Sequence, residues 1–111
     1  MLPLLQARSA LILAILQYEH RVQGHVEQFK AIVELKDGSR LHINEVWLSG
    51  TLHKYAYYWL TPTGALVQGW DNAPHHPHIA TSPHHTHTPN GIDVSHVRSL
   101  LDVLAEIEKR I

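Results

Sequence analysis

Histidines are concentrated in one short stretch of the chain, residues 70–87, whose sequence is WDNAPHHPHIATSPHHTH. Six of the 11 histidines of the protein fall here, namely His75, His76, His78, His84, His85 and His87. The stretch is internal and is interrupted by prolines, which distinguishes it from an expression tag. Imidazole can bind a metal ion, transfer protons near neutral pH, or form hydrogen bonds that depend on protonation. These residues are therefore the first candidates for a functional site.

Proton transfer during RNA cleavage is one chemistry that this stretch suits. Internal cleavage needs a base for the ribose 2′-hydroxyl, an acid for the leaving oxygen, and a cation or donor for the phosphate. Asp71 can orient one imidazole of the set. The acid–base candidates are His75, His76, His84, His85 and His87. Residues elsewhere that can bind phosphate or stack on a base are Lys54, Arg40, Arg98, Tyr55, Tyr57 and Trp70.

Metal binding is the alternative chemistry. In an extended segment, side chains two residues apart point the same way, so His76 pairs with His78 and His85 pairs with His87. Four imidazoles, or three with Asp71 or Asp93 in place of one, provide enough ligands for Zn, Ni or Cu. The spacing matches no standard zinc motif. A third interpretation is structural, in which the imidazoles only bind neighbouring carbonyl groups.

Length and composition indicate a single domain over residues 1–111. The chain has 44% apolar and 17% charged residues and a formal net charge of -1, so it lacks the basic field that would indicate a nucleic-acid partner. The absence of cysteine excludes disulfides, zinc–thiolate sites and cysteine nucleophiles. The apolar run Ala10–Leu16 is far shorter than the ~20 residues of a membrane span. We therefore expect a cytoplasmic protein without membrane contact.

The hydrophobic pattern predicts two helices and a small sheet. Apolar residues at helical spacing predict one helix over residues 1–18 and another over residues 95–111. Alternating residues predict four strands within residues 26–70, joined as an antiparallel meander, with Asp37-Gly38 in the first turn. Residues 71–94 contain the histidines and are predicted to form a loop. This order is typical of an α+β domain, with both helices on one face of a four-stranded antiparallel sheet.

The second face of the predicted sheet remains open. Such a surface can bind a ligand or a second subunit. The predicted N-terminal helix is also unusually apolar for the surface of a monomer. We therefore expect a homodimer that this helix completes.

Two motifs resemble a known family. Trp70–Pro77 (WDNAPHHP) and Pro83–His87 (PHHTH), followed by an amphipathic C-terminal segment, are similar to the TumE-type toxins of bacterial toxin–antitoxin systems. The Leu35–Ser39 hairpin and the Tyr55–Tyr57 strand are placed as in that family, so the resemblance extends over about residues 25–110. It implies a small toxin that acts on RNA or the ribosome and is neutralised by a helix-turn-helix antitoxin.

The resemblance also assigns candidate functional residues, with two departures. The candidates are Asp71, Asn72, His75, His76, His84, His85 and His87. His78 stands where an acidic residue commonly follows the HHP motif, and Tyr58-Trp59 stand where a histidine is common. Without that acid, a mechanism in which it orients an imidazole loses one partner.

The sequence thus predicts the RNA-directed toxin of a toxin–antitoxin pair. Its expected activity is that of a metal-independent endoribonuclease or a translation inhibitor, with loop histidines as acid and base and with no cofactor. The proposed substrate-binding residues are Lys54, Tyr55, Tyr57 and Trp70. The alternative is a non-catalytic metal-binding or interaction module. In that interpretation, Zn or Ni is held by His76, His78, His85 and His87.

Overall fold

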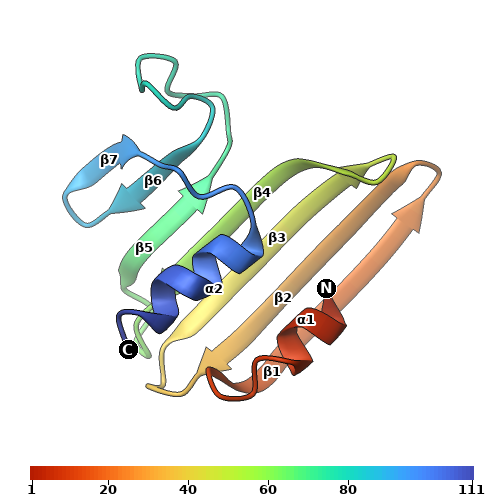
Figure 1. Ribbon diagram of the computed structural model, residues 1–111, viewed down its shortest axis with the longest axis vertical. Coiled ribbons are helices and arrows are strands. Elements are labelled where there is room, and N and C mark those ends of the chain that lie inside the picture. The colour runs from red at the N-terminus through yellow and green to blue at the C-terminus, as the bar shows by residue number, and fades with distance from the viewer.

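The computed structural model describes residues 1–111, and its main element is one antiparallel sheet (Figure 1). Seven strands lie side by side in the order of the sequence, so each pairs with the next. The strands are β1 (Ile12–Gln23), β2 (Val26–Leu35), β3 (Arg40–Leu48), β4 (Thr51–Leu60), β5 (Leu66–Asp71), β6 (His85–Thr88) and β7 (Gly91–Val94). Two helices, α1 (Leu2–Gln6) and α2 (Leu100–Glu108), lie over the same face of the sheet (Figure 1). Neither helix is long and apolar enough to cross a membrane.

The predicted α+β domain with a four-stranded sheet is wrong. The strands β2 to β5 extend from Val26 to Asp71, one residue beyond the predicted 26–70, but they are the middle of a seven-stranded sheet. The helices that accompany it have only five and nine residues. The turn after β2 does contain Asp37-Gly38, where Gly38 has a φ of 86°. Glycine adopts this angle at little cost because it has no side chain.

The N-terminal helix predicted over residues 1–18 is also wrong, because only Leu2–Gln6 is helical and the segment from Ile12 onward is the edge strand β1. The register of β1 against β2 shifts between Ile12 and Ala14 and again between Ile15 and Gln17. Each bulge adds one residue and breaks the period-2 alternation of a strand. The residues of β1 that pack on the core are therefore spaced three apart, at Ile12, Ile15 and Tyr18. This spacing imitates the apolar face of a helix.

The predicted loop over residues 71–94 contains the hairpin of β6 and β7. Thr88 pairs with Gly91, which leaves Pro89 and Asn90 in the turn, and Gly91 has a φ of 130°. Asn-Gly is a strong hairpin signal when it lies between alternating apolar residues. Here the residues before it are histidines and threonines, so the alternation that predicts a strand was missing. The loop that remains runs from residue 72 to residue 84.

The C-terminal helix begins later than the predicted residue 95. Ser99 is its N-cap, and the Ser99 hydroxyl accepts a hydrogen bond from the Asp102 N–H at 3.3 Å. Such a bond satisfies one of the free N–H groups at the start of a helix. The helical residues that pack on the core are Leu100, Val103, Leu104 and Ile107.

Strand parity divides the sheet into a covered and an open face. Successive side chains of a strand point to opposite faces. Tyr55, Tyr57 and Trp59 of β4 are buried among the apolar residues under the helices. Lys54, Ala56 and Tyr58 therefore project from the other face, which we call the open face.

The covered face also contains an unusual buried carboxylate. Glu45 is 5% exposed, and it accepts hydrogen bonds from the Tyr57 hydroxyl at 2.5 Å and from Trp47 Nε1 at 2.9 Å. Burial, and then the nearby Glu45 charge, raise the pKa of Tyr57, so the phenol stays a donor. The Tyr57 and Trp47 donors thus replace the water that burial removes from the Glu45 carboxylate.

We expect Tyr57→Phe to lower the free energy of unfolding by about 1–3 kcal/mol, because one buried acceptor loses its donor. Urea unfolding followed by circular dichroism measures this change. Tyr18→Phe is the matched control, since Tyr18 packs on the same core and forms no side-chain hydrogen bond. Equal losses in both variants would show that the bond to Glu45 contributes nothing of its own.

Candidate functional site

The ends of β5 and β6 bring three polar side chains together on the open face. Asp71, the last residue of β5, pairs with His85, and Gly69 pairs with His87. His85 and His87 are two residues apart in β6, so both side chains point to the same side as Asp71. We call these three residues the Asp71 cluster.

The nitrogen and oxygen atoms of the Asp71 cluster converge on one point. His85 Nε2 lies 2.8 Å from Asp71 Oδ1 and 3.0 Å from His87 Nε2. His87 Nε2 lies 3.0 Å from Asp71 Oδ2. His85 is 2% exposed and Asp71 is 6% exposed, whereas the side chain of His87 is 26% exposed. The cluster is therefore closed at His85 and reaches solvent at His87.

Hydrogen bonds from outside hold two members of the cluster. His85 Nδ1 donates to the Pro83 carbonyl at 2.9 Å, because a carbonyl oxygen can only accept. Asp71 accepts from the Tyr58 hydroxyl at 2.7 Å and from the Ala73 N–H at 3.0 Å. Burial, and then the Asp71 carboxylate, raise the pKa of Tyr58, which keeps its hydroxyl protonated.

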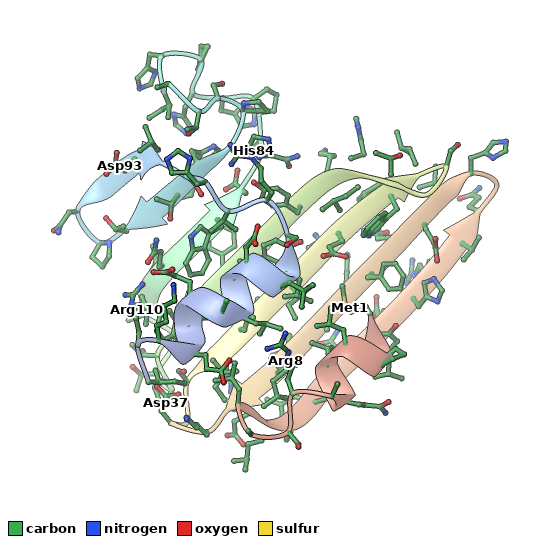
Figure 2. All side chains as sticks on the ribbon, viewed as in Figure 1. Met1, Arg8, Asp37, His84, Asp93 and Arg110 are labelled. Atoms are coloured by element: carbon green, nitrogen blue, oxygen red, sulfur yellow. The ribbon has the colours of Figure 1, made fainter.

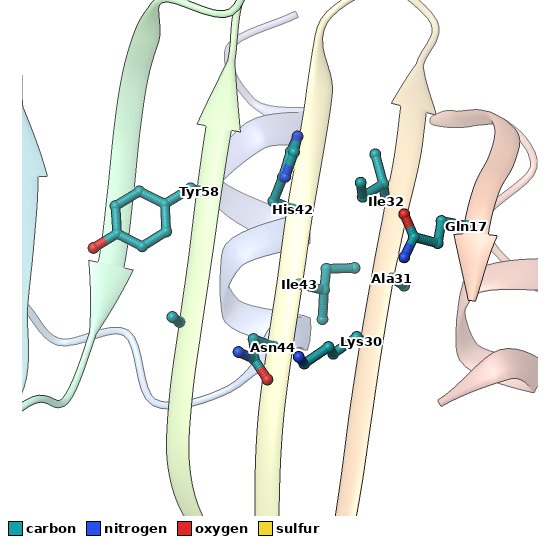
Figure 3. A pocket seen from close by; sticks show the side chains of 9 residues that line it. Gln17, Lys30, Ala31, Ile32, His42, Ile43, Asn44 and Tyr58 are labelled. Carbon is teal, nitrogen blue, oxygen red and sulfur yellow. The ribbon is translucent and has the colours of Figure 1, made fainter. Parts of the chain in front are cut away.

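Tyr58 reaches Asp71 because Gly69 gives it room. Tyr58 of β4 pairs with Gly69 of β5, and a Cβ atom at Gly69 would overlap the Tyr58 ring. Figure 3 shows the ring extending sideways from its own strand toward the neighbouring one. Tyr58 and Gly69 are the site residues that the sequence analysis missed. The alternation of side chains along a strand could have identified Tyr58, because it places Tyr58 on the face opposite to Tyr55 and Tyr57.

We expect Gly69→Ala to displace the Tyr58 ring and to remove its bond to Asp71. The free energy of unfolding should fall by about 1–3 kcal/mol, as is usual when a well-packed site is overfilled. Urea unfolding of Gly69→Ala, Tyr58→Ala and the double variant measures the coupling between the two residues. If Gly69→Ala costs as much in the Tyr58→Ala background as in the wild type, the close contact with the ring is not the cause.

The loop after β5 places a further imidazole beside the cluster. The His76 ring lies edge-on to His85, with 4.9 Å between ring centroids, and 6.2 Å from His87. Desolvation, followed by the neighbouring His85, His78 and His87, lowers the pKa of His76 and favours its neutral form. His78 lies behind His76 at 6.0 Å and is exposed. His76 is therefore at the mouth of the cluster, and His78 is outside it.

His84 belongs to a different set of contacts. Its Nδ1 atom lies 2.6 Å from the Tyr55 hydroxyl, which also donates to the Val97 carbonyl at 3.0 Å. Burial raises the pKa of Tyr55 to about 12, and desolvation followed by the Arg98 charge lowers the pKa of His84. Figure 2 shows His84 where the loop enters β6, close to the segment that leads into α2. His84 thus connects the loop to the covered side of the sheet.

The other predicted site residues lie apart from the cluster. His75 is exposed in the loop. Asn72 joins two strands, because its side chain accepts from the Tyr55 N–H and donates to the His53 carbonyl, both at 3.0 Å. The proposed stacking residues Tyr55, Tyr57 and Trp70 are buried in the core, so their rings are not available to a base. Of the proposed substrate-binding residues, only Lys54 projects from the open face.

The open face carries a groove that leads to the cluster. One part, a hollow of about 380 Å³, extends over β1 to β4 and includes Gln17, Lys30, His42 and Asn44 (Figure 3). A second hollow shares Asn44 and Tyr58 with the first and continues past Lys54 to Asp71. The residues of the groove thus place amide, imidazole and ammonium groups beside the Asp71 cluster.

The arrangement has two chemical uses. Convergent imidazoles and a carboxylate can share protons, or they can bind a metal ion, since the candidate ligand atoms lie within 4.8 Å of one another. Of the metal ligands predicted from the sequence, His85 and His87 are in the cluster. His76 is adjacent and His78 is outside, whereas Asp71 is the third member.

Comparison with known protein families gives a match over nearly the whole chain. The model of a family described as Toxin TumE matches residues 3–111. No curated protein and no solved structure matches the chain.

Proposed function

Because the chain belongs to the TumE toxin family, we propose that this toxin acts on RNA and cleaves it at the Asp71 cluster. The observation that supports this proposal is the position of the cluster. His85 and Asp71 are buried, His87 reaches solvent, and Asp71 lines a groove that contains Lys30 and Lys54. Such a groove suits a flexible, negatively charged strand.

The charged and polar side chains of the groove support single-stranded RNA as its ligand. Lys30 and Lys54 supply positive charge for the phosphates, while Asn44 and His42 offer groups that can bind sugars or base edges. RNA recognition commonly uses unpaired bases, because their edges are free to form hydrogen bonds. With Tyr55, Tyr57 and Trp70 in the core, binding rests on these polar groups instead of on stacking.

Cleavage proceeds by attack of the ribose 2′-oxygen on the adjacent phosphorus. His76 accepts the proton of the 2′-hydroxyl, the new O–P bond forms, and the bond from phosphorus to the 5′-oxygen breaks. The 5′-oxygen takes a proton from solvent, so the products carry a 2′,3′-cyclic phosphate and a 5′-hydroxyl. The Asp71 cluster lies beside His76, and Lys54, which lines the same hollow as Asp71, supplies positive charge for the phosphate on which negative charge develops.

Incubation of untagged protein with a 5′-labelled single-stranded RNA tests this function. We expect internal cuts with cyclic phosphate ends, and no cut where one 2′-deoxyribose replaces the ribose at the cleavage site. His76→Ala should lose most of the activity, and His78→Ala, the matched control, should keep it. A parallel reaction contains ribosomes, and cleavage in that reaction alone would show that the toxin requires ribosomes. Intact RNA in both reactions would contradict the proposal.

We expect the double variant Lys30→Glu/Lys54→Glu to bind RNA at least about tenfold more weakly. The salt dependence of binding should fall by about one phosphate contact for each lysine lost. Fluorescence anisotropy at several salt concentrations measures both quantities. Lys36→Glu/Lys109→Glu makes the same change in net charge outside the groove and is the control. Equal weakening in both variants would mean that only net charge matters.

The partner of this toxin is an antitoxin. We propose one of the helix-turn-helix type, acting in the cytoplasm and covering the groove and the Asp71 cluster. The exposed edge strand β1, with Leu13 and Leu16 at its bulges, is the surface on which two copies would pair as a homodimer. The second candidate function is that of a metal-binding module, in which the Asp71 cluster binds an ion and the protein does not cleave RNA.

A further inference from the structure

We infer that Asp71, His85 and His87 bind one divalent transition-metal ion. The nitrogen and oxygen atoms of these three side chains face one another at 2.8 to 3.0 Å. They come from two adjacent strands whose pairing fixes their positions. The sheet therefore places the three ligands, and the loop over residues 72–84 supplies two of the groups that hold them.

The protons of the cluster cannot satisfy all three contacts while Asp71 is ionised. His85 Nδ1 carries a proton for the Pro83 carbonyl, so in the neutral imidazole His85 Nε2 is a bare acceptor that faces an Asp71 oxygen. A single proton on either Nε2 atom leaves the other nitrogen facing the carboxylate without one. Protons on both Nε2 atoms leave two donors facing each other at 3.0 Å. One cation between the three side chains satisfies every contact.

The surrounding hydrogen bonds are those of a metal site. A metal-bound histidine usually donates its second N–H to a carbonyl or carboxylate, which fixes the tautomer and the ring. His85 does so to the Pro83 carbonyl at 2.9 Å. A metal-bound carboxylate is usually held in turn, as Asp71 is by the Tyr58 hydroxyl and the Ala73 N–H. Both the ligands and their supports are thus present.

The ligand types identify the class of ion. Two imidazoles and one carboxylate favour zinc or a neighbouring first-row ion over magnesium and calcium, which prefer oxygen ligands. Tetrahedral ligand atoms bonded at about 2.0–2.2 Å lie about 3.3–3.6 Å from one another. The atoms of the cluster, at 2.8 to 3.0 Å, would therefore move apart by about 0.5 Å around a zinc ion. Three protein ligands leave at least one position for water or for a substrate oxygen.

This inference deepens the proposed function and proposes a ligand set that differs in part from the one expected from the sequence. Asp71 takes the place of His76 and His78, because it is the residue that pairs with His85 across the strands. The ion supplies positive charge beside the scissile phosphate. That role rests on the proposed function, whereas binding of the ion is measured without RNA.

Zinc titration of untagged, EDTA-treated protein tests the site. After removal of the chelator, we expect calorimetry to show one Zn²⁺ per chain and thermal unfolding to show a higher Tm with Zn²⁺. His87→Ala should weaken binding at least about tenfold, in line with the loss of a ligand. His78→Ala removes an exposed imidazole outside the cluster and should bind as the wild type does. His87 is partly exposed, so its replacement should preserve the fold, which circular dichroism checks.

The outcomes separate the ion from the RNA chemistry. Absence of saturable binding, or equal binding by wild type and His87→Ala, overturns the metal site. Binding that falls in His78→Ala instead identifies adventitious surface histidines and overturns it as well. Bound zinc with intact RNA would retain the site and contradict the nuclease. RNA cleaved at the full rate in excess EDTA would retain the nuclease and contradict the role of the ion.

Discussion

Replacement of Asp71 by asparagine is expected to abolish growth inhibition in cells and to lower RNA cleavage at least about 100-fold. Asparagine has nearly the same shape as aspartate but no charge. The variant therefore lacks the carboxylate that His85, His87 and Tyr58 contact. Losses of this size are usual when one electrostatic group is removed from a reaction centre. Induced expression in bacteria measures toxicity, and the labelled RNA assay measures cleavage.

Asp93→Asn is the matched control for this experiment. Asp93 is exposed in β7, and its carboxylate accepts only the N–H of the next residue. The control should remain as toxic as the wild type. If Asp71→Asn is folded and still fully toxic, the Asp71 cluster is not the reaction centre. Circular dichroism and solubility of the purified variant distinguish loss of chemistry from loss of fold.

The cluster could be predicted in part because it depends on local strand geometry. His85 and His87 are two residues apart, and an extended backbone places such side chains on one side. Asp71 was a candidate through its position in the WDNAPHHP motif. Its contact with His85 could not be predicted, since it depends on the register of β5 against β6 across the loop.

The sheet was underestimated for two physical reasons. In β1, the bulges place Ile12, Ile15 and Tyr18 at the spacing of a helix, so periodicity favoured the wrong element. In β6, the buried face carries Thr86, which hydrogen-bonds the Gly69 carbonyl at 2.7 Å, and not a large apolar residue. Hydrophobic alternation cannot detect a strand that is held by polar contacts. The Asn90-Gly91 pair at the end of the turn was the remaining signal.

The aromatic residues of β4 show what the alternation of side chains along a strand can predict. Tyr55, Tyr57 and Tyr58 lie in one strand, and the sequence analysis chose the first two as stacking residues. Two of the three had to be buried, because one face of β4 packs under the helices. Had Trp59 been assigned to the core, the same alternation would have placed Tyr58 on the face of Asp71.

Leu104→Ala is expected to lower the free energy of unfolding by about 2–5 kcal/mol, the usual cost of a large cavity in a packed core. Leu104 is 0% exposed in α2 and packs in the core that this helix shares with the covered face. Leu101→Ala makes the same change in the same helix at a side chain that is 47% exposed, and should cost much less. Urea unfolding compares the two variants.

The same pair of variants separates stability from function. The Asp71 cluster lies on the open face, so folded Leu104→Ala protein should bind Zn²⁺ and cleave RNA as the wild type does at low temperature. Its activity should then be lost at a lower temperature than that of Leu101→Ala. If activity falls at temperatures where Leu104→Ala is fully folded, α2 positions the site through the sheet. The contact of Tyr55 with His84 and Val97 is the connection through which it would do so.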